Sequence, residues 1–222
     1  MRQRLERPRP DVPRLPARPC TLSTPRSSVP GRALADLARC GMARNRRRPS
    51  KAKCVMRISL VRHGIAVNRG TPGYDDDSQR PLTAKGERRM RRAAEGMLAL
   101  GLAPDVLLSS PYRRAQQTAD IVAQVLKISV GPHLSATLTP GGDPRQLIEE
   151  LQSAGRTPQD MMLVGHEPYL SRLISTLLTG NPNLPVVMRK GGVCTLELDT
   201  LRFGRCAQLI WLLAPRHLRR LA

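Results

Sequence analysis

Three short apolar runs, each followed at once by polar residues, constrain the fold of this chain more than any other feature. They span residues 58–61, 106–108 and 161–164, and they lead into Arg62-His63-Gly64, Ser109-Ser110-Pro111 and Gly165-His166-Glu167. A near-continuous apolar run of this length is typical of a strand buried on both faces of a parallel sheet. Parallel strands end at a common edge, where open α/β sheets bind their ligands. We therefore expect the polar residues of the three exits to meet in one crevice.

Helical patterns separate these runs. Thr83 is suited to cap a helix that ends near Gly101, and Pro111 is suited to open a second helix that runs to about Lys127. We expect further helices over residues 143–151 and 168–178, a short extended piece over 128–130, strands over 193–198 and 208–212, and a last basic turn over 216–221. The alternation predicts an α/β fold, a three-layer sandwich with a mostly parallel central sheet, helices on both faces and one antiparallel strand.

The first 55 residues differ in composition from the rest of the chain. They hold fifteen Lys and Arg against three acidic residues, together with eight of the twenty prolines. Such a stretch buries too little apolar area to offset the entropy of ordering, so we predict a disordered basic extension over residues 1–55 and one domain over residues 56–222. The extension has three interpretations: a basic arm for nucleic acid or a membrane surface, an organellar transit peptide, or a segment outside the working protein, with Met56 as the true start. We favour the third.

Composition also argues against several functional classes. No apolar core follows the basic start and no run reaches the length of a membrane span, so we expect no membrane partner. The five cysteines show no paired metal-ligand spacing, which is typical of reduced thiols in a cytoplasmic protein. Five aromatic side chains are few for a single-strand nucleic-acid platform, so a nucleic-acid partner rests on charge alone.

Arg62, His63 and Arg114 offer chemistry suited to a phosphoryl group. The Arg62 guanidinium presents a planar fork of donors that matches a phosphate or carboxylate, and His63 is a nitrogen nucleophile that is substantially neutral near pH 7. In the second helix, Arg113 lies on the solvent-facing stripe, whereas Arg114 shares its side with Thr118 and the packed face. Arg114 also lies in a first helical turn, where free backbone N–H groups favour an anion. We therefore choose Arg114 as the ligand.

These motifs resemble the three signatures of the histidine phosphatase, or phosphoglycerate-mutase-like, superfamily. The matching stretches are residues 60–64, 109–118 and 164–167, while residues 77–83 resemble a loop of the SixA-type phosphohistidine phosphatase branch. The resemblance covers residues 56–222 and none of the extension. It implies that His63 is the nucleophile and carries a transient phosphate, with no metal or other cofactor. It also implies a set of residues that surround the phosphoryl group: Arg62, Arg114, His166 and, in addition, Arg80.

The resemblance leaves the proton donor open between Asp77 and Glu167. Asp77 adjoins the loop motif, and Glu167 stands where acid phosphatases of the superfamily carry an aspartate donor; for each, a structural or solvating role is the alternative. An alcohol leaving group, near water's pKa of ~15.7, needs a donor, whereas imidazole, at ~6.5, needs one much less. We therefore favour phosphohistidine in a phosphorelay protein as the substrate.

Two alternative functions use the same residues. One is a phosphatase of small phosphate esters, and the other is a non-catalytic phosphate-binding scaffold, against which the intact set of histidines and arginines argues. Lys190 has two interpretations, a contact to an anionic substrate or an ordinary turn before a strand. A basic face near Lys85, Arg88 and Arg92 is a candidate docking surface for an acidic partner. Ile65 replaces a residue that is commonly acidic in the SixA-type branch, which bears on substrate recognition.

Overall fold

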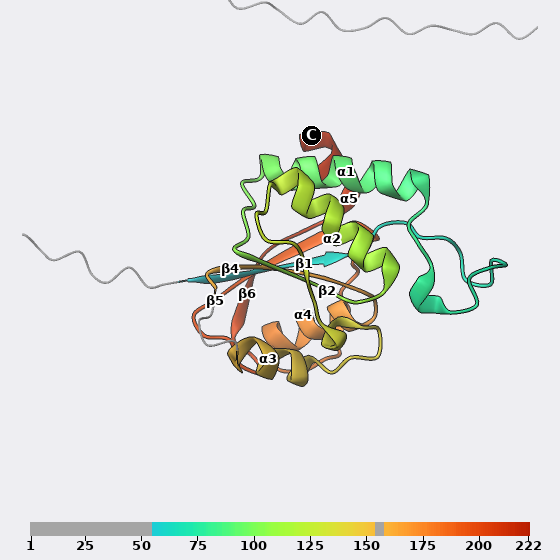
Figure 1. The fold of residues 1–222 in the computed structure, drawn as a ribbon. Helices are drawn as coiled ribbons and strands as arrows, with labels where there is room; N and C mark the ends of the chain where they lie inside the picture. The colour runs from blue at the N-terminus through green and yellow to red at the C-terminus, as the bar shows by residue number, and fades with distance from the viewer. Residues whose placement is uncertain (1–54, 154–157) are drawn as a thin grey trace, which may run out of the picture. The chain divides into compact units, whose positions relative to one another are not determined.

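The computed structural model describes residues 55–153 and 158–222, in which a six-stranded sheet forms the middle layer (Figure 1). The strand order is β3-β2-β4-β1-β5-β6, with β1 at Met56–Arg62, β2 at Val106–Ser109, β3 at His133–Leu134, β4 at Asp160–Gly165, β5 at Val193–Leu198 and β6 at Ala207–Leu213. The first four strands are mutually parallel, and β5 runs antiparallel to both of its neighbours. The prediction of a mostly parallel sheet with one antiparallel strand is confirmed.

Helices cover both faces of this sheet. α1 (Ala84–Ala99), α2 (Arg113–Leu126) and α5 (Pro215–Leu221) lie on one face, and α3 (Pro144–Ser153) and α4 (Tyr169–Thr179) lie on the other (Figure 1). Short 3-10 helices, η1 (Asp77–Gln79) and η2 (Ala136–Leu138), lie in connecting loops. Side chains of β1 alternate between the layers, since Ile58 and Leu60 join the apolar core with α3 and α4, whereas Val61 joins the core with α1 and α2. The predicted three-layer sandwich is confirmed.

The start of α1 is fixed by a cap and by a close backbone contact. Thr83 Oγ1 accepts a hydrogen bond from the Gly86 N–H at 3.0 Å. A Cβ atom at Gly86 would lie 2.0 Å from the carbonyl oxygen of Ile65, so only glycine fits at this position. The first turn of α1 is therefore packed directly against the loop that follows β1.

Three details differ from the elements expected from the sequence. Residues 128–130 form an irregular bend rather than an extended piece, because Lys127 ends α2 in the left-handed conformation (φ 56) and the chain reaches the sheet only at β3. α2 begins at Arg113 rather than at Pro111, since Tyr112 is its extended N-cap. The last residues form a helix, α5, rather than a turn, because Leu218 is buried in the core under α1.

The predicted disordered extension over residues 1–55 lies outside the described residues except for Val55. β1 begins directly after Val55, at Met56. Within residues 55–153 and 158–222, no helix combines the length and the apolar composition needed to cross a bilayer.

Three parallel strands deliver their carboxyl ends to one edge of the sheet. Arg62 at the end of β1 is in register with Gly165 at the end of β4. The His63 N–H donates to the Gly165 carbonyl oxygen at 3.1 Å, and the Ser110 N–H, after β2, donates to the Val164 carbonyl oxygen at 3.0 Å. The exits of β1, β2 and β4 therefore lie side by side, as the three apolar runs predict.

Candidate active site

The three strand exits surround a cavity of about 320 Å³, which we call the catalytic cavity. Its walls are mostly charged or polar: Arg62, His63, Asn68, Arg69, Arg80, Arg114, His166, Glu167 and Lys190, with Val67 and Pro140. Six of the seven site residues predicted from the sequence line it, and the seventh, Asp77, binds its arginines. Among the described residues, no group of three or more His, Cys, Asp or Glu side chains is placed to hold a metal ion.

His63 is oriented by its neighbour in the chain. Its Nδ1 lies 2.8 Å from the Gly64 carbonyl oxygen, and because a carbonyl only accepts, Nδ1 carries the proton and donates it to this bond. The free lone pair of the neutral ring is therefore on Nε2. Burial, followed by the charge of His166, lowers the pKa of His63 well below its ordinary value of 6.5. His63 is thus neutral near pH 7 and competent as a nucleophile.

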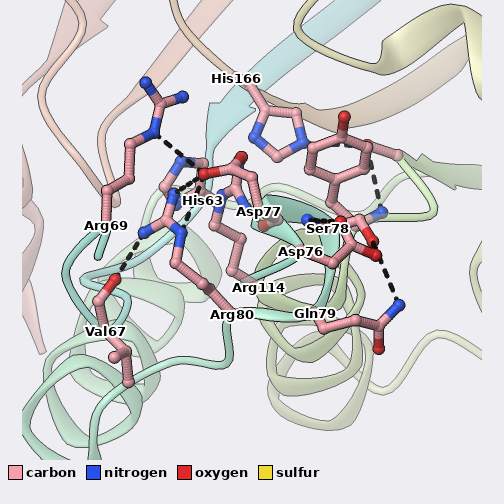
Figure 2. Close-up of polar contacts among 12 residues, drawn as sticks. His63, Val67, Arg69, Asp76, Asp77, Ser78, Gln79, Arg80, Arg114 and His166 are labelled. Atoms are coloured by element: carbon pink, nitrogen blue, oxygen red, sulfur yellow. Dashed lines mark hydrogen bonds and ion pairs between the residues drawn. The ribbon is translucent and has the colours of Figure 1, made fainter. Parts of the chain in front are cut away.

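His166 faces His63 across the catalytic cavity (Figure 2). The two ring centroids are 4.9 Å apart and the ring planes are inclined at 52°. His166 Nε2 lies 2.9 Å from Ser110 Oγ, while Nδ1 has no hydrogen-bond partner among the described residues. Burial and then the charge of Arg114 lower the pKa of His166 to about 3. A phosphate dianion in the cavity opposes this shift, because its charge favours the imidazolium.

Two arginines approach the cavity with unused donors. Arg114 is buried at the start of α2, whereas Arg113 beside it is exposed, in agreement with the choice made from the helical spacing. The Arg114 guanidinium lies 4.9 Å from the centroid of the Tyr112 ring. Arg62 donates from Nη1 to the Met188 carbonyl oxygen at 2.7 Å. The Nε atoms of Arg62 and Arg114 are buried without a hydrogen-bond partner in the described part of the chain, so both arginines retain donors that a bound anion can satisfy.

The carboxylate of Asp77 brings three arginines together (Figure 2). Arg80 donates to Oδ1 from Nε at 2.9 Å and from Nη2 at 2.6 Å, and Arg69 donates to the same oxygen at 2.9 Å. Arg114 donates from Nη2 to Oδ2 at 2.9 Å. Burial opposes ionisation, but hydrogen bonds and charge from Arg80 and Arg114 prevail and lower the pKa of Asp77 to about 2. Asp77 is therefore an internal oxyanion bound to the guanidiniums that we expect to hold phosphate.

The two candidate proton donors differ in their protonation. Asp77 is ionised at all but strongly acidic pH, which makes it a poor donor near pH 7. Burial raises the pKa of Glu167, against the hydrogen bond from Ser171 and the charge of Arg62. The Glu167 Oε2 accepts from the Ser171 hydroxyl, and Oε1 is buried without a partner among the described residues. Of the two carboxyls, Glu167 is the better suited to carry a proton into the catalytic cavity.

Thr118 supports the site, although no role in the chemistry was expected for it from the sequence. Its hydroxyl accepts from the Gly64 N–H at 3.0 Å and donates to the Arg114 carbonyl oxygen at 2.6 Å. One buried hydroxyl thus joins the first turn of α2 to the loop after β1. This contact sets the position of Arg114 relative to the end of β1.

Three further residues near His63 and His166 were not singled out from the sequence. Ser110 hydrogen-bonds to His166, and the Tyr112 ring meets His166 edge-on with centroids 5.1 Å apart. Both lie inside the matched stretch 109–118, so the motif was the signal that could have identified them. Arg69 comes from the irregular loop between β1 and α1, where no periodicity or spacing indicates a function.

The fold and the cavity together define a phosphoryl-transfer enzyme. An α/β sheet brings a neutral imidazole, a second imidazole and unsatisfied guanidiniums to one edge, and phosphoryl transfer depends on such positioning and charge neutralisation. Residues 58–137 match the model of the histidine phosphatase superfamily (branch 1). The chain belongs to this superfamily, whose members are phosphatases and mutases.

Individual relatives agree with this assignment. An uncharacterized protein of Picosynechococcus sp. is 33% identical over 150 residues, which cover 66% of this chain and 88% of the relative. The phosphohistidine phosphatase SixA of Escherichia coli is 26% identical over 165 residues, which cover 74% of this chain and 97% of SixA. A solved structure of the protein histidine phosphatase SixA complexed with tungstate superposes with a TM-score of 0.64 at 26% identity, covering 73% of this chain and 99% of that chain. The resemblance drawn from the motifs is confirmed.

Proposed function

We propose that this protein hydrolyses phosphohistidine in a partner protein, through a phosphohistidine intermediate on its own His63. One observation carries the proposal. The Nδ1–H of His63 donates to Gly64, so the nucleophilic Nε2 is free, and the ring lines a cavity walled by guanidiniums. A nitrogen nucleophile and fixed positive charge are the two components that phosphoryl transfer to a histidine needs.

In the first step, Nε2 of His63 attacks the phosphorus atom of the substrate. The bond between phosphorus and the substrate imidazole breaks, and its electron pair stays on the leaving nitrogen, which takes up a proton from solvent. Arg62 and Arg114, joined by Arg80, neutralise the charge on the phosphoryl oxygens. Because protein cations supply this charge, we expect turnover in the presence of a metal chelator.

In the second step, water attacks the phosphorus atom of phosphorylated His63. The N–P bond breaks, its electron pair returns to Nε2, and orthophosphate leaves the cavity. The proton lost by water passes to the Glu167 carboxylate, which lines the same cavity. His166, which has no partner at Nδ1 among the described residues, offers a hydrogen bond to the phosphoryl group in both steps.

The leaving group favours phosphohistidine over an alkyl ester. An alcohol near water's pKa of ~15.7 needs a strong proton donor, whereas imidazole at ~6.5 departs with little help. Asp77 is held ionised by arginines, and Glu167 is the remaining carboxyl with a raised pKa. The similarity to SixA, which is named as a phosphohistidine phosphatase, supports the same substrate class.

The test compares two substrates in EDTA: a protein carrying phosphohistidine and p-nitrophenyl phosphate. We expect a higher kcat/KM with the phosphohistidine protein, loss of both activities in His63→Ala, and an acid-labile phosphoenzyme in the unsubstituted protein. His133→Ala is the matched control, because His133 is exposed and does not line the catalytic cavity. A higher kcat/KM with p-nitrophenyl phosphate would instead identify a small phosphate ester as the substrate. Binding of phosphate with no hydrolysis of either substrate would indicate a non-catalytic scaffold.

A further inference from the structure

A second cavity, of about 570 Å³, adjoins the catalytic cavity and shares Arg62 and Lys190 with it. Its walls come from four segments that are distant in sequence: the end of β1, the first turns of α1, residues 189–191 and α5. Six cations line it, namely Arg62, Arg89, Arg189, Lys190, Arg216 and Arg219. Among the described residues that form its walls, none is acidic.

The positive charge of this cavity is little balanced within the fold, since Glu167 attracts Arg62 but no carboxylate among the described residues lines the cavity. In the described part of the chain, none of its six cations forms an ion pair with a carboxylate. Burial and then the charge of Arg89 lower the pKa of Arg219, and burial and then the charge of Arg62 lower the pKa of Lys190. Like charges around one cavity repel, and an anion between them reduces that repulsion.

Backbone contacts hold the walls in place. The Gly191 N–H donates to the Arg62 carbonyl oxygen at 2.9 Å, which ties residues 189–191 to the end of β1. Behind the residues that line the cavity, α1 and α5 are in close contact, since a Cβ atom at Gly96 of α1 would lie 2.0 Å from the Leu218 carbonyl oxygen of α5. The backbone segments that carry the cations are therefore packed together rather than gathered on a loose surface.

A neighbouring depression differs from the second cavity in the sign of the charges that line it. The depression on the other side of α1 is lined by Arg88, Arg91 and Arg92, but it also contains Glu87 and Asp120. Positive charge there is interspersed with acids, as on an ordinary solvated face. The basic residues of that depression supply charge-matched controls for the second cavity.

We propose that the second cavity is a second anion site, which binds a phosphate or polyphosphate group of a small ligand. Five of its six cations are guanidiniums, whose donor forks match phosphate oxygens. A cavity larger than the catalytic cavity suits a small molecule, and Met90 and Pro215 give its carbon skeleton an apolar wall. The site does not depend on the identity of the substrate that is dephosphorylated.

Calorimetric titration with inorganic tripolyphosphate tests the proposal, in the full-length protein carrying His63→Ala to prevent turnover. We expect Arg89→Gln with Arg219→Gln to weaken binding about tenfold, because two cations of the site are removed. Arg88→Gln with Arg91→Gln removes the same charge from the neighbouring face and should change the affinity less than about twofold.

Three results would overturn the second anion site. Equal losses of affinity in the two double variants would mean that tripolyphosphate binding depends only on the net charge of the protein. An equal loss in Arg80→Gln would place the ligand in the catalytic cavity instead, since Arg80 lines the catalytic cavity but not the second cavity. A hexaglutamate peptide that binds more tightly than tripolyphosphate would contradict a phosphate ligand. Because binding is measured without turnover, a failure of the proposed reaction does not affect these outcomes.

Discussion

Arg114 donates two hydrogen bonds to Asp77, one to a carboxylate oxygen at 2.9 Å and one to the main-chain oxygen at 2.6 Å. The arginine is buried at the base of the catalytic cavity, and the aspartate comes from η1, thirty-seven residues earlier in the chain. A phosphoryl group that uses the Arg114 donors must compete with this carboxylate. Asp77 thus occupies guanidinium donors of Arg114 that would otherwise be free to bind a phosphoryl group.

Replacing Asp77 should therefore tighten the binding of orthophosphate. In Asp77→Asn the competing charge is gone, and we expect the inhibition constant of orthophosphate to fall by roughly three- to tenfold. Asp76→Asn is the control, because Asp76 accepts from the Ser78 N–H and binds no arginine among the described residues. Unchanged or weaker inhibition in Asp77→Asn would show that the carboxylate does not compete with phosphate.

Arg114 and Arg113 provide a matched pair in adjacent positions. Arg114→Lys keeps the charge but loses the planar fork, and we expect kcat/KM with p-nitrophenyl phosphate to fall by about 100-fold. Arg113→Lys changes an exposed side chain and should alter kcat/KM less than about twofold. Similar losses in both variants would contradict a specific role for the Arg114 guanidinium.

Glu167 is predicted to matter in proportion to the difficulty of the leaving group. We expect Glu167→Gln to lower kcat with an alkyl phosphate by about 100-fold, because the departing alkoxide then lacks a donor. With p-nitrophenyl phosphate, whose leaving group needs little protonation, the first step should be little affected. Equal losses in the first step with both substrates would contradict the donor role and point to a structural one, through the contact with Ser171. The comparison is made on the first step because the second, in which Glu167 takes the proton from water, is common to both substrates.

Buried neutral histidine makes the fold sensitive to acid. His166 has a pKa of about 3 in the folded protein, against its ordinary value of 6.5, so between these pH values only the unfolded chain takes up this proton. The stabilisation is complete above 6.5 and is lost as the pH falls, at up to ~1.4 kcal/mol per pH unit. Urea unfolding near pH 6.5 and near pH 4.5 measures this slope. We expect His166→Gln to reduce the slope and His133→Gln, at an exposed position, to leave it unchanged.

Gly86 is predicted to be intolerant of any side chain. In Gly86→Ala the new methyl group meets the Ile65 carbonyl oxygen, and separating α1 from the loop after β1 should cost about 1–3 kcal/mol in the free energy of unfolding. Gly131→Ala is the control, since nothing lies within 4 Å of a Cβ atom there. Urea denaturation of the two variants makes the comparison, and equal stabilities would show that the contact relaxes without cost.

Much of the scaffold and the placement of the central residues could be predicted from the sequence. The three apolar runs predicted which strands end together, and hence that His63 and His166 share one edge of the sheet. Helical spacing separated buried Arg114 from exposed Arg113. These predictions succeed because the pattern of burial along one strand or one helix depends only on residues that are close together in the sequence. The catalytic roles of these residues stay predictions.

Contacts between segments distant in the sequence were decided only by the tertiary structure. Asp77 was a candidate proton donor in the sequence, and folding makes it an ionised partner of Arg80 and Arg114. The second cavity forms because α5 packs against α1, although the sequence indicated only a last basic turn. No local sequence pattern predicts such contacts, because they depend on the conformations of the loops and on how the layers pack. The sequence by itself therefore determined most of the strands and helices and the edge at which the three strand exits meet. Only the packing of loops and layers decided which arginines Asp77 binds and that α5 lies against α1.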